Sequence, residues 1–391
     1  MSPSEPAFPE SALNSISEID FKQAVDRARL SKAHAFLEGA VADGAFAGAV
    51  ALIALGGRVV AHWAIGRAQV EPDERPMQLD TIFDLASLTK PLAGATAALL
   101  LLEDGVWSLD DPVARFIPEF GGAGKDEVTL RQLLTHSSGL APWAATYAHA
   151  RDPESALRYV CSLPLTYMPG SNVAYSDLGF SMIGHLVRRV SGSGIDAFLS
   201  SRVWQPLGMA DTGYLPAETL RPRIAATERG NQFERVMVSG RGETFDDWRD
   251  NVLVGEVNDG NTHYALGGIS SHAGLFSSAP DILKFALMYL GTGPRLLSTA
   301  TIAAATSNHT PGLPSARGLG WELRPRAGGD LLSASAFGHT GFTGTSLVID
   351  PEHRLVIILL TNRTHPDANN ERISTVRPRF HNLVGASLVL R

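Results

Sequence analysis

Cysteine is almost absent from this chain. Its 391 residues contain one cysteine, Cys161, so no disulfide can form within the chain. Free cysteines in proteins are mostly small buried hydrophobic residues, and we expect Cys161 to be one of them. A chain without disulfides fits a reducing compartment.

Charge is sparse as well. Charged residues make up 19% of the chain, the net charge is −7 and the isoelectric point is near 5.9. The sequence has no block of Lys and Arg, and proteins bind nucleic acids and anionic membranes chiefly through such positive surfaces. The composition therefore argues against nucleic-acid and membrane partners.

Long hydrophobic runs are missing too. The most apolar segment, residues 91–102, is too short to span a bilayer, which takes about 20 residues. The first residues, Met1-Ser-Pro-Ser-Glu-Pro, lack the basic and apolar regions of a secretory signal. We expect a soluble, cytoplasmic protein with a substantial core, and the sequence leaves its oligomeric state open.

Local patterns predict strands at both ends of the chain and helices between them. Residues 1–20 are polar and rich in Pro and Ser, which predicts a flexible arm. Residues 225–263 are polar with weak periodicity, which is typical of a long functional loop. The expected helices include 21–43, 153–163, 177–190, 280–290 and 372–390. The expected strands are 48–55, 58–65, 273–277, 318–324, 334–339, 345–350 and 355–361.

This order predicts an α+β fold. One antiparallel sheet would be built from distant segments, flanked by terminal helices, with a large and mostly helical insertion. We expect residues 21–80 and 262–391 to form the discontinuous domain that holds the sheet, and residues 81–261 to form the helical domain. The active site would lie at their junction.

One of the few lysines stands in a motif. Ser87-Leu88-Thr89-Lys90 places a serine and a lysine three residues apart, where an apolar helix begins. Side chains at this spacing share one helix face, so the Lys90 amine can reach the Ser87 hydroxyl and act as its base. By itself the motif is also compatible with an N-cap serine followed by a solvated lysine.

Two further segments carry polar residues of a kind found in hydrolase sites. Tyr175-Ser176-Asp177 lies at the start of the helix expected over 177–190, where a phenol can point into a cleft. His339-Thr340-Gly341 follows an expected strand. A glycine at 341 lets a substrate lie close to the strand edge and lets a backbone N–H face a carbonyl oxygen.

Taken together, these segments resemble the serine β-lactamase and penicillin-binding-protein superfamily. SLTK, YSD and HTG stand in the chain order of its Ser-x-x-Lys, Tyr-x-Asn and Lys/His-Thr-Gly motifs. The likeness is greatest to the class C-like branch, which includes D-alanyl-D-alanine carboxypeptidases and family VIII carboxylesterases. It extends over about residues 30–390 and includes stretches such as TLRQLLTHSSGL and GHTGFTGTSLVIDP.

The resemblance implies a role for each motif residue. Ser87 would be the acylated nucleophile and Lys90 its base, with a pKa that burial lowers toward the working pH. Tyr175 would pass protons to the leaving group and activate the deacylating water. The backbone N–H groups of Ser87 and Phe342 would form the oxyanion hole. The substrate-binding residues would be Asp177, His339, Thr340 and Gly341. Apart from the resemblance, the aromatic Trp143 is expected to line the cleft and to contact the substrate.

Two positions depart from the family pattern. Asp177 replaces an asparagine whose amide commonly holds the acylamide side chain of β-lactams and peptides, and a carboxylate can only accept hydrogen bonds. His339 stands where β-lactamases often carry Lys, and a neutral histidine attracts a substrate carboxylate less strongly. Both departures favour esters over β-lactams and peptides.

Three functions therefore compete. The leading interpretation is a serine hydrolase that cleaves a small-molecule carboxylic ester through an acyl-enzyme, with weak β-lactamase activity. The alternatives are a D-alanyl-D-alanine carboxypeptidase or class C-like β-lactamase, and a non-catalytic sensor of acyl or peptide ligands. An α/β-hydrolase is disfavoured because the chain has no G-x-S-x-G motif.

The sequence predicts no cofactor and no metal. Asp259, His263 and His272 could suggest a metal cluster, but their spacing does not fit the paired ligands of an HExxH-type helix. His136, within THSSGL, is interpreted as a structural turn residue and not as a base.

Overall fold

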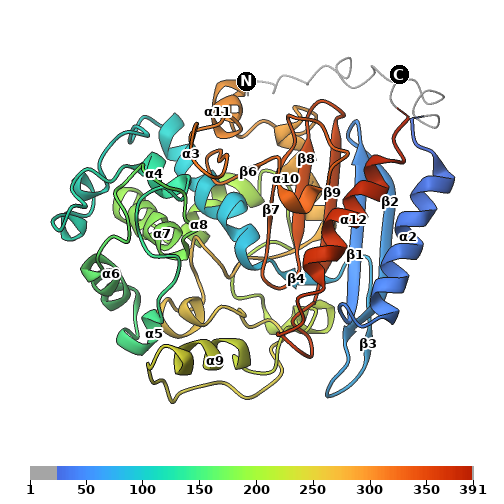
Figure 1. Ribbon diagram of the computed structural model, residues 1–391, viewed down its shortest axis with the longest axis horizontal. Coiled ribbons are helices and arrows are strands. Elements are labelled where there is room, and N and C mark those ends of the chain that lie inside the picture. Colours follow the sequence, from blue (N-terminus) through green and yellow to red (C-terminus); the bar gives the residue numbers. More distant parts are fainter. Residues whose placement is uncertain (1–23, 390–391) are drawn as a thin grey trace, which may run out of the picture.

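The computed structural model describes residues 24–389, so the predicted arm at 1–20 lies outside the described residues. Seven strands form one antiparallel sheet, which lies at one side of the molecule (Figure 1). Their order across the sheet is β3-β2-β1-β9-β8-β7-β6, so strands from both ends of the chain meet where β1 pairs with β9. The strands are β1 (Gly48–Leu55), β2 (Arg58–Gln69), β3 (Arg75–Pro76), β6 (Glu322–Leu323), β7 (Phe337–Thr340), β8 (Ser346–Asp350) and β9 (Leu355–Thr361).

A second, two-stranded sheet lies next to the nucleophile segment. It pairs β4 (Ile82–Asp84) with β5 (Phe276–Ser278) in antiparallel fashion. The α+β class and the antiparallel sheet built from distant segments are thus confirmed.

The β1–β2 hairpin shows how the local sequence sets the geometry. Gly56 and Gly57 have φ of +56° and +83°, a conformation that a tight hairpin turn requires and that glycine adopts without strain. Every residue of β1 is buried, which explains its uninterrupted run of apolar residues. Ala49 and Ile53 face a core shared with the terminal helices, whereas Val50 and Leu52 face the main core.

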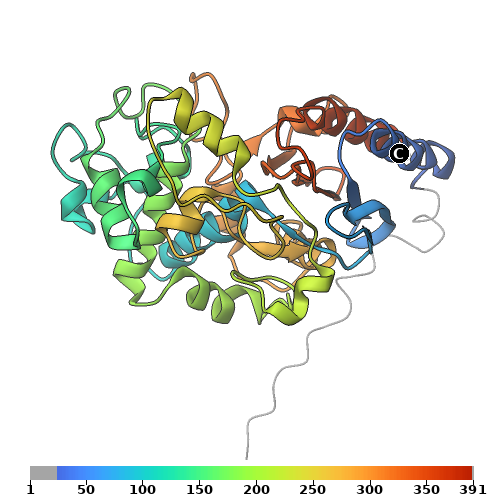
Figure 2. The ribbon, with the colours of Figure 1, turned by 90° about the horizontal axis from the view of Figure 1, so that it is seen from below.

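Two terminal helices cover one face of the sheet. Helices α2 (Arg27–Ala42) and α12 (Ile373–Gly385) run side by side over it (Figure 2). Leu37 and Phe380, one from each helix, are fully buried between the helices and the sheet. The predicted ends of these helices were too wide, and residues 21–23 and 390 lie outside the described part.

The other helices surround the nucleophile segment. They are α3 (Thr96–Glu103), α4 (Leu130–Leu134), α5 (Thr146–His149), α6 (Pro153–Ser162), α7 (Asp177–Ser191), α8 (Ile195–Leu199), α9 (Gln232–Gly240), α10 (Ala279–Tyr289) and α11 (Thr299–Ala305). Within residues 24–389 no helix has the length and apolarity that crossing a membrane requires.

Two local predictions were wrong. The stretch expected to be a loop at 225–263 contains helix α9, whose sequence has only a few apolar residues. The strand expected at 318–324 shortens to Glu322–Leu323, because Gly320 has φ +82° and packs against Ala95, which an extended strand residue could not do.

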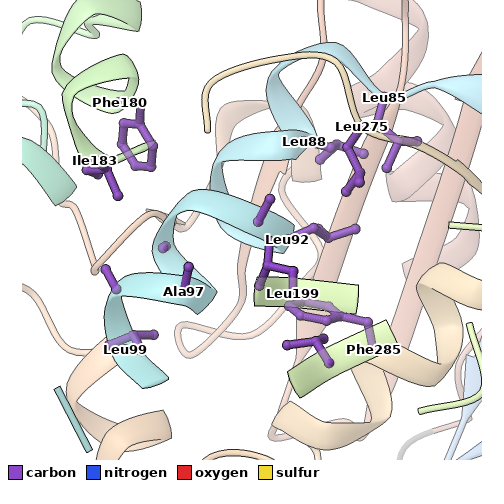
Figure 3. Packing of buried hydrophobic residues seen from close by; sticks show 14 of the residues in the cluster. Leu85, Leu88, Leu92, Ala97, Leu99, Phe180, Ile183, Leu199, Leu275 and Phe285 are labelled. Atoms are coloured by element: carbon purple, nitrogen blue, oxygen red, sulfur yellow. The ribbon is translucent and has the colours of Figure 1, made fainter. Parts of the chain in front are cut away.

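The main core holds the nucleophile segment rigidly. Leu88 and Leu92, on either side of Lys90, point into a cluster that also contains Phe285 of α10 (Figure 3). Phe180 of α7 belongs to the same cluster. Because protein interiors are close-packed, this core leaves the segment little freedom to move.

Candidate active site

Ser87 lies in a strained turn at the floor of a cleft. It belongs to a 3-10 turn, η2 (Ala86–Leu88), directly after β4. Ala86 has φ +47°, a conformation that non-glycine residues rarely adopt. The buried Asp84 stabilises it, since Oδ1 accepts the Ala86 N–H at 2.8 Å. Strain of this kind is often found next to reactive side chains.

The same turn is fastened to two other parts of the chain. The hydroxyls of Thr343 and Thr345 donate to the carbonyl oxygens of Asp84 and Leu85 at 2.8 and 2.9 Å. The Asn258 N–H donates to Asp84 Oδ2 at 2.6 Å. These bonds set the position of Ser87 relative to the end of β7.

Lys90 is buried completely and lies against three oxygen atoms. Its Nζ donates to Ser87 Oγ at 2.9 Å and to the His272 carbonyl at 3.1 Å, and it lies 2.7 Å from Asp177 Oδ1. The predicted α-helix is instead a 3-10 turn followed by a π-helical segment, η3 (Lys90–Ala95). Residues three apart in a 3-10 turn are eclipsed, so the predicted approach of Lys90 to Ser87 is still made.

The ion pair with Asp177 controls the charge of Lys90. Burial by itself would lower the pKa of the Lys90 ammonium, but the Asp177 carboxylate and the Tyr175 phenol outweigh burial and raise it. The expectation that burial lowers this pKa toward the working pH was therefore wrong. Lys90 is an ammonium in the resting site.

Tyr175 completes this group. Its ring centroid lies 4.8 Å from Lys90 Nζ. Burial raises the pKa of the Tyr175 phenol, and the nearby Lys90 ammonium only partly offsets that effect. The phenol is therefore neutral and carries a proton.

The start of α7 places Asp177 and Tyr175. Ser176 is the N-cap of this helix, and its Oγ accepts the Gly179 N–H at 3.0 Å. His136 Nδ1 accepts the Ser176 N–H at 3.0 Å, and burial lowers the pKa of His136 well below its ordinary value. His136 is therefore a neutral acceptor with a structural role.

The end of β7 forms the opposite wall of the cleft. At Gly341 a Cβ atom would lie 2.4 Å from the Leu85 carbonyl oxygen, so only glycine allows β7 to pack this closely on the nucleophile turn. Phe342 follows, and its N–H makes no hydrogen bond to any residue of 24–389. A free N–H in this place can act as an oxyanion donor.

His339 is neutral. Burial and the nearby Lys90 and Arg317 cations lower its pKa to about 3. Nδ1 is 2.8 Å from the Thr340 carbonyl and carries the proton, because a carbonyl oxygen can only accept. Nε2 has no hydrogen-bond partner among the described residues.

Two cavities meet at Ser87, and four residues line both: Ser87, Tyr175, Phe233 and Phe342. The first, of about 450 Å³, is lined by His339, Thr340 and Gly341. The second, of about 320 Å³, is lined by Trp143 and Asp177. The structure thus brings all the predicted site residues to one cleft.

Sequence reasoning missed several residues of this cleft. Arg317, Arg363 and Arg377 line the first cavity, and Arg377 donates to the Gly341 carbonyl at 2.7 Å. Phe233 of α9 packs on Phe342 with their rings tilted and their centroids 4.9 Å apart. A run of apolar residues at helical spacing in 233–238 could have indicated α9, but no local signal points from Arg317 or Arg377 to the cleft.

Asp259 and His272, two residues of the possible metal cluster, pair with each other. Asp259 Oδ1 lies 3.1 Å from His272 Nε2, and the His272 carbonyl accepts from Lys90. Within residues 24–389 no group of three or more His, Cys, Asp and Glu side chains is arranged to hold a metal ion. The Asp259–His272 pair instead supports the segment that contacts Lys90.

The chain matches one protein-family model and is similar to several known proteins. A family model described as Beta-lactamase matches residues 33–377. A Bacillus subtilis protein described as "N-acetylmuramyl-L-alanine amidase" is 32% identical over 371 residues, which cover 86% of this chain and 81% of the relative. An Escherichia coli K12 protein described as "Putative D-alanyl-D-alanine carboxypeptidase" is 32% identical over 319 residues, which cover 75% of this chain and 72% of the relative.

Among solved structures, a family VIII carboxylesterase superposes with a TM-score of 0.71 at 20% identity. The superposition covers 93% of this chain and 99% of the esterase. At this identity the likeness concerns the fold alone.

Proposed function

This chain belongs to the beta-lactamase family of serine hydrolases, and on that premise we propose that it hydrolyses carboxylic esters through an acyl-enzyme on Ser87. The observation that carries the proposal is the position of Lys90 Nζ, 2.9 Å from Ser87 Oγ and 2.7 Å from Asp177 Oδ1. This position places the Lys90 amine, which can hold or release a proton, next to the Ser87 nucleophile. Tyr175 lies beside both residues.

Acylation forms the bond from Ser87 Oγ to the ester carbonyl carbon and then breaks the bond to the alcohol oxygen. In the fraction of molecules in which Lys90 is an amine, the Ser87 proton passes to Lys90. The neutral Tyr175 phenol gives its proton to the departing alkoxide and regains one from the Lys90 ammonium. The N–H groups of Ser87 and Phe342 stabilise the oxyanion between these steps. Water then attacks the acyl-enzyme, with the same groups acting in reverse.

The charge of Lys90 favours esters over amides. Because Asp177 holds Lys90 as an ammonium, the amine that can act as a base is scarce near neutral pH. A small population of the amine is sufficient for an ester, whose carbonyl is more reactive and whose alkoxide leaves more readily than an amine. Asp177 also lacks the N–H donor with which an asparagine would hold an acylamide group.

A second candidate is an amidase or peptidase that acts on a substrate with a carboxylate. Arg317 and Arg377 line the cavity beside His339, and guanidinium groups bind carboxylates well. These arginines offset the weak attraction expected from a neutral His339. The two relatives with 32% identity carry amidase and carboxypeptidase descriptions, which also supports this candidate.

The deciding experiment compares matched acyl compounds. We would measure kcat/KM for p-nitrophenyl butyrate, butyryl p-nitroanilide, a chromogenic cephalosporin, a D-Ala-D-Ala peptide and N-acetylmuramyl-L-alanine. Ser87→Ala is the control for background hydrolysis. We expect the ester to be hydrolysed far better than the other four, and a preference for the peptide or the muramyl amide would establish the second candidate in its place.

A further inference from the structure

The two cavities that meet at Ser87 differ in charge. The one beside His339 is lined by three arginines and two glutamates, so its cations outnumber its carboxylates. The other, which we call the α9 compartment, is lined by four carboxylic side chains, and none of the described residues lining it is Lys, Arg or His. These side chains are Asp177, Glu228, Glu234 and Asp259.

Two of the four carboxylic side chains are already paired with a basic side chain. Asp177 pairs with Lys90 at 2.7 Å, and Asp259 pairs with His272 at 3.1 Å. Among residues 24–389, Glu228 accepts hydrogen bonds from two neutral groups, the Asn258 amide at 3.2 Å and the Phe233 N–H at 3.4 Å, while Arg249 and Arg363 act on it only from a distance.

Glu234 of α9 is left partly unsatisfied. Its side chain lines the compartment although the residue is only 9% exposed, and Oε1 accepts the Gly260 N–H at 2.7 Å. Oε2 lies near the Tyr147 phenol, but neither atom makes a hydrogen bond of ordinary geometry. Of the four carboxylic side chains, Glu234 is therefore the one whose oxygens are least well satisfied.

Most of the other lining residues are aromatic or apolar. Trp143, Phe233, Phe342 and Met237 border the same space. Aromatic faces combined with carboxylates are surroundings that bind organic cations. The volume of about 320 Å³ fits part of an organic molecule and is much larger than a metal ion.

We propose that the substrate carries a protonated amine or a quaternary nitrogen, which is held in the α9 compartment beside Glu234 while the ester carbonyl lies at Ser87. This inference rests on the proposed function and adds a substrate class to it. An ester has an acyl half and an alcohol half, and the half that carries the positive charge is the one that enters the α9 compartment.

The ionisation of the carboxyls supports this assignment. Burial raises the pKa of Glu234 to about 8 and that of Glu228 to about 7. Ionising them inside the protein is unfavourable without a nearby positive charge, and a cation beside them would stabilise the ionised forms.

The test uses ester pairs that differ in charge and not in shape. The first pair is the p-nitrophenyl ester of trimethylammoniobutyrate and that of its neutral isostere, dimethylhexanoate. The second pair is acetylcholine and dimethylbutyl acetate, in which the charge lies in the alcohol half. We expect kcat/KM to favour the cationic member of one pair by about tenfold or more, and that pair identifies the half in the compartment.

Matched variants connect the preference to Glu234. Glu234→Gln should reduce the ratio of cationic to neutral rates toward one. Glu371→Gln makes the same change at the other cavity and should keep the ratio of the wild type. Circular dichroism checks that both variants are folded.

A binding measurement separates this inference from the proposed function. Calorimetric titration with choline and with neutral dimethylbutanol needs no turnover, so it reports on the compartment even if esters are not substrates. Tighter binding of choline that Glu234→Gln weakens supports the inference. Equal rates within both ester pairs, or equal binding of choline and dimethylbutanol, would overturn it.

Discussion

The Asp177 carboxylate lies 2.7 Å from the Lys90 ammonium, and the lysine of this pair is fully buried while the aspartate is 21% exposed. The pair links the first residue of α7 to the segment that carries the nucleophile. Removing one partner of a buried pair leaves the other charge uncompensated, so both residues are expected to matter for stability as well as for rate.

Ser87→Ala should abolish turnover of every substrate while the fold is retained, because it removes the atom that is acylated. Mass spectrometry of the wild type after reaction with a fluorophosphonate should place the adduct on Ser87. Ser137 and Ser138, two further serines in the THSSGL stretch, are both buried, and an adduct on either would falsify the assignment.

Lys90→Ala and Tyr175→Phe should each lower kcat by about 10²-fold or more, since positioned acid–base groups typically contribute 10²–10⁴. The double variant should be little slower than the slower single variant, because both residues serve one proton path. Near wild-type activity in either single variant would mean that another residue supplies the base.

Asp177→Asn should move the pH dependence of ester hydrolysis. In the wild type the Lys90 pKa is raised, so the amine forms only as the pH rises, and kcat/KM should increase from neutral into alkaline solution. Without the carboxylate the Lys90 pKa falls, and the rising limb should shift by about one to three pH units toward lower pH.

The control for Asp177→Asn is Asp73→Asn, which makes the same change at an exposed position. Rate profiles with p-nitrophenyl butyrate measure the shift. The new amide should also improve cephalosporin hydrolysis more than ester hydrolysis, and coincident pH profiles for wild type and variant would rule out the role given to Asp177.

Gly341→Ala should damage the site through packing. The added Cβ would lie 2.1 Å from Thr345 Oγ1 and 2.4 Å from the Leu85 carbonyl oxygen, so β7 must move away from the nucleophile turn. A displacement of this kind can lower the rate by about 10²-fold, and we also expect a lower Tm.

Gly39→Ala provides the comparison for Gly341→Ala, because a Cβ at this position in α2 meets no atom within 4 Å. Thermal unfolding and kcat/KM should be close to wild type for this variant. If Gly341→Ala behaved in the same way, the close packing of β7 on the nucleophile turn would not be needed for activity.

The local sequence was sufficient where neighbouring residues act on one another. The strands on either side of Gly56-Gly57, the helix that begins after Ser176 and the approach of Lys90 to Ser87 depend on residues a few positions apart, and all three are present. Helix α9 was missed because polar, glycine-bearing sequence surrounds its short run of apolar residues, and its place is decided by packing, such as that of Phe233 on Phe342.

For the chemistry of the cleft, too, some features followed from the sequence and others only from the tertiary structure. The sequence by itself determined the family, the order of the motifs and the residue types that could react. Only the tertiary structure decided that Asp177 faces Lys90 and holds it charged, that Arg377 supports the strand edge at Gly341, and that Glu234 borders the nucleophile. These contacts join residues far apart in the chain, and whether burial or a nearby charge sets a pKa depends on distances that no local pattern contains.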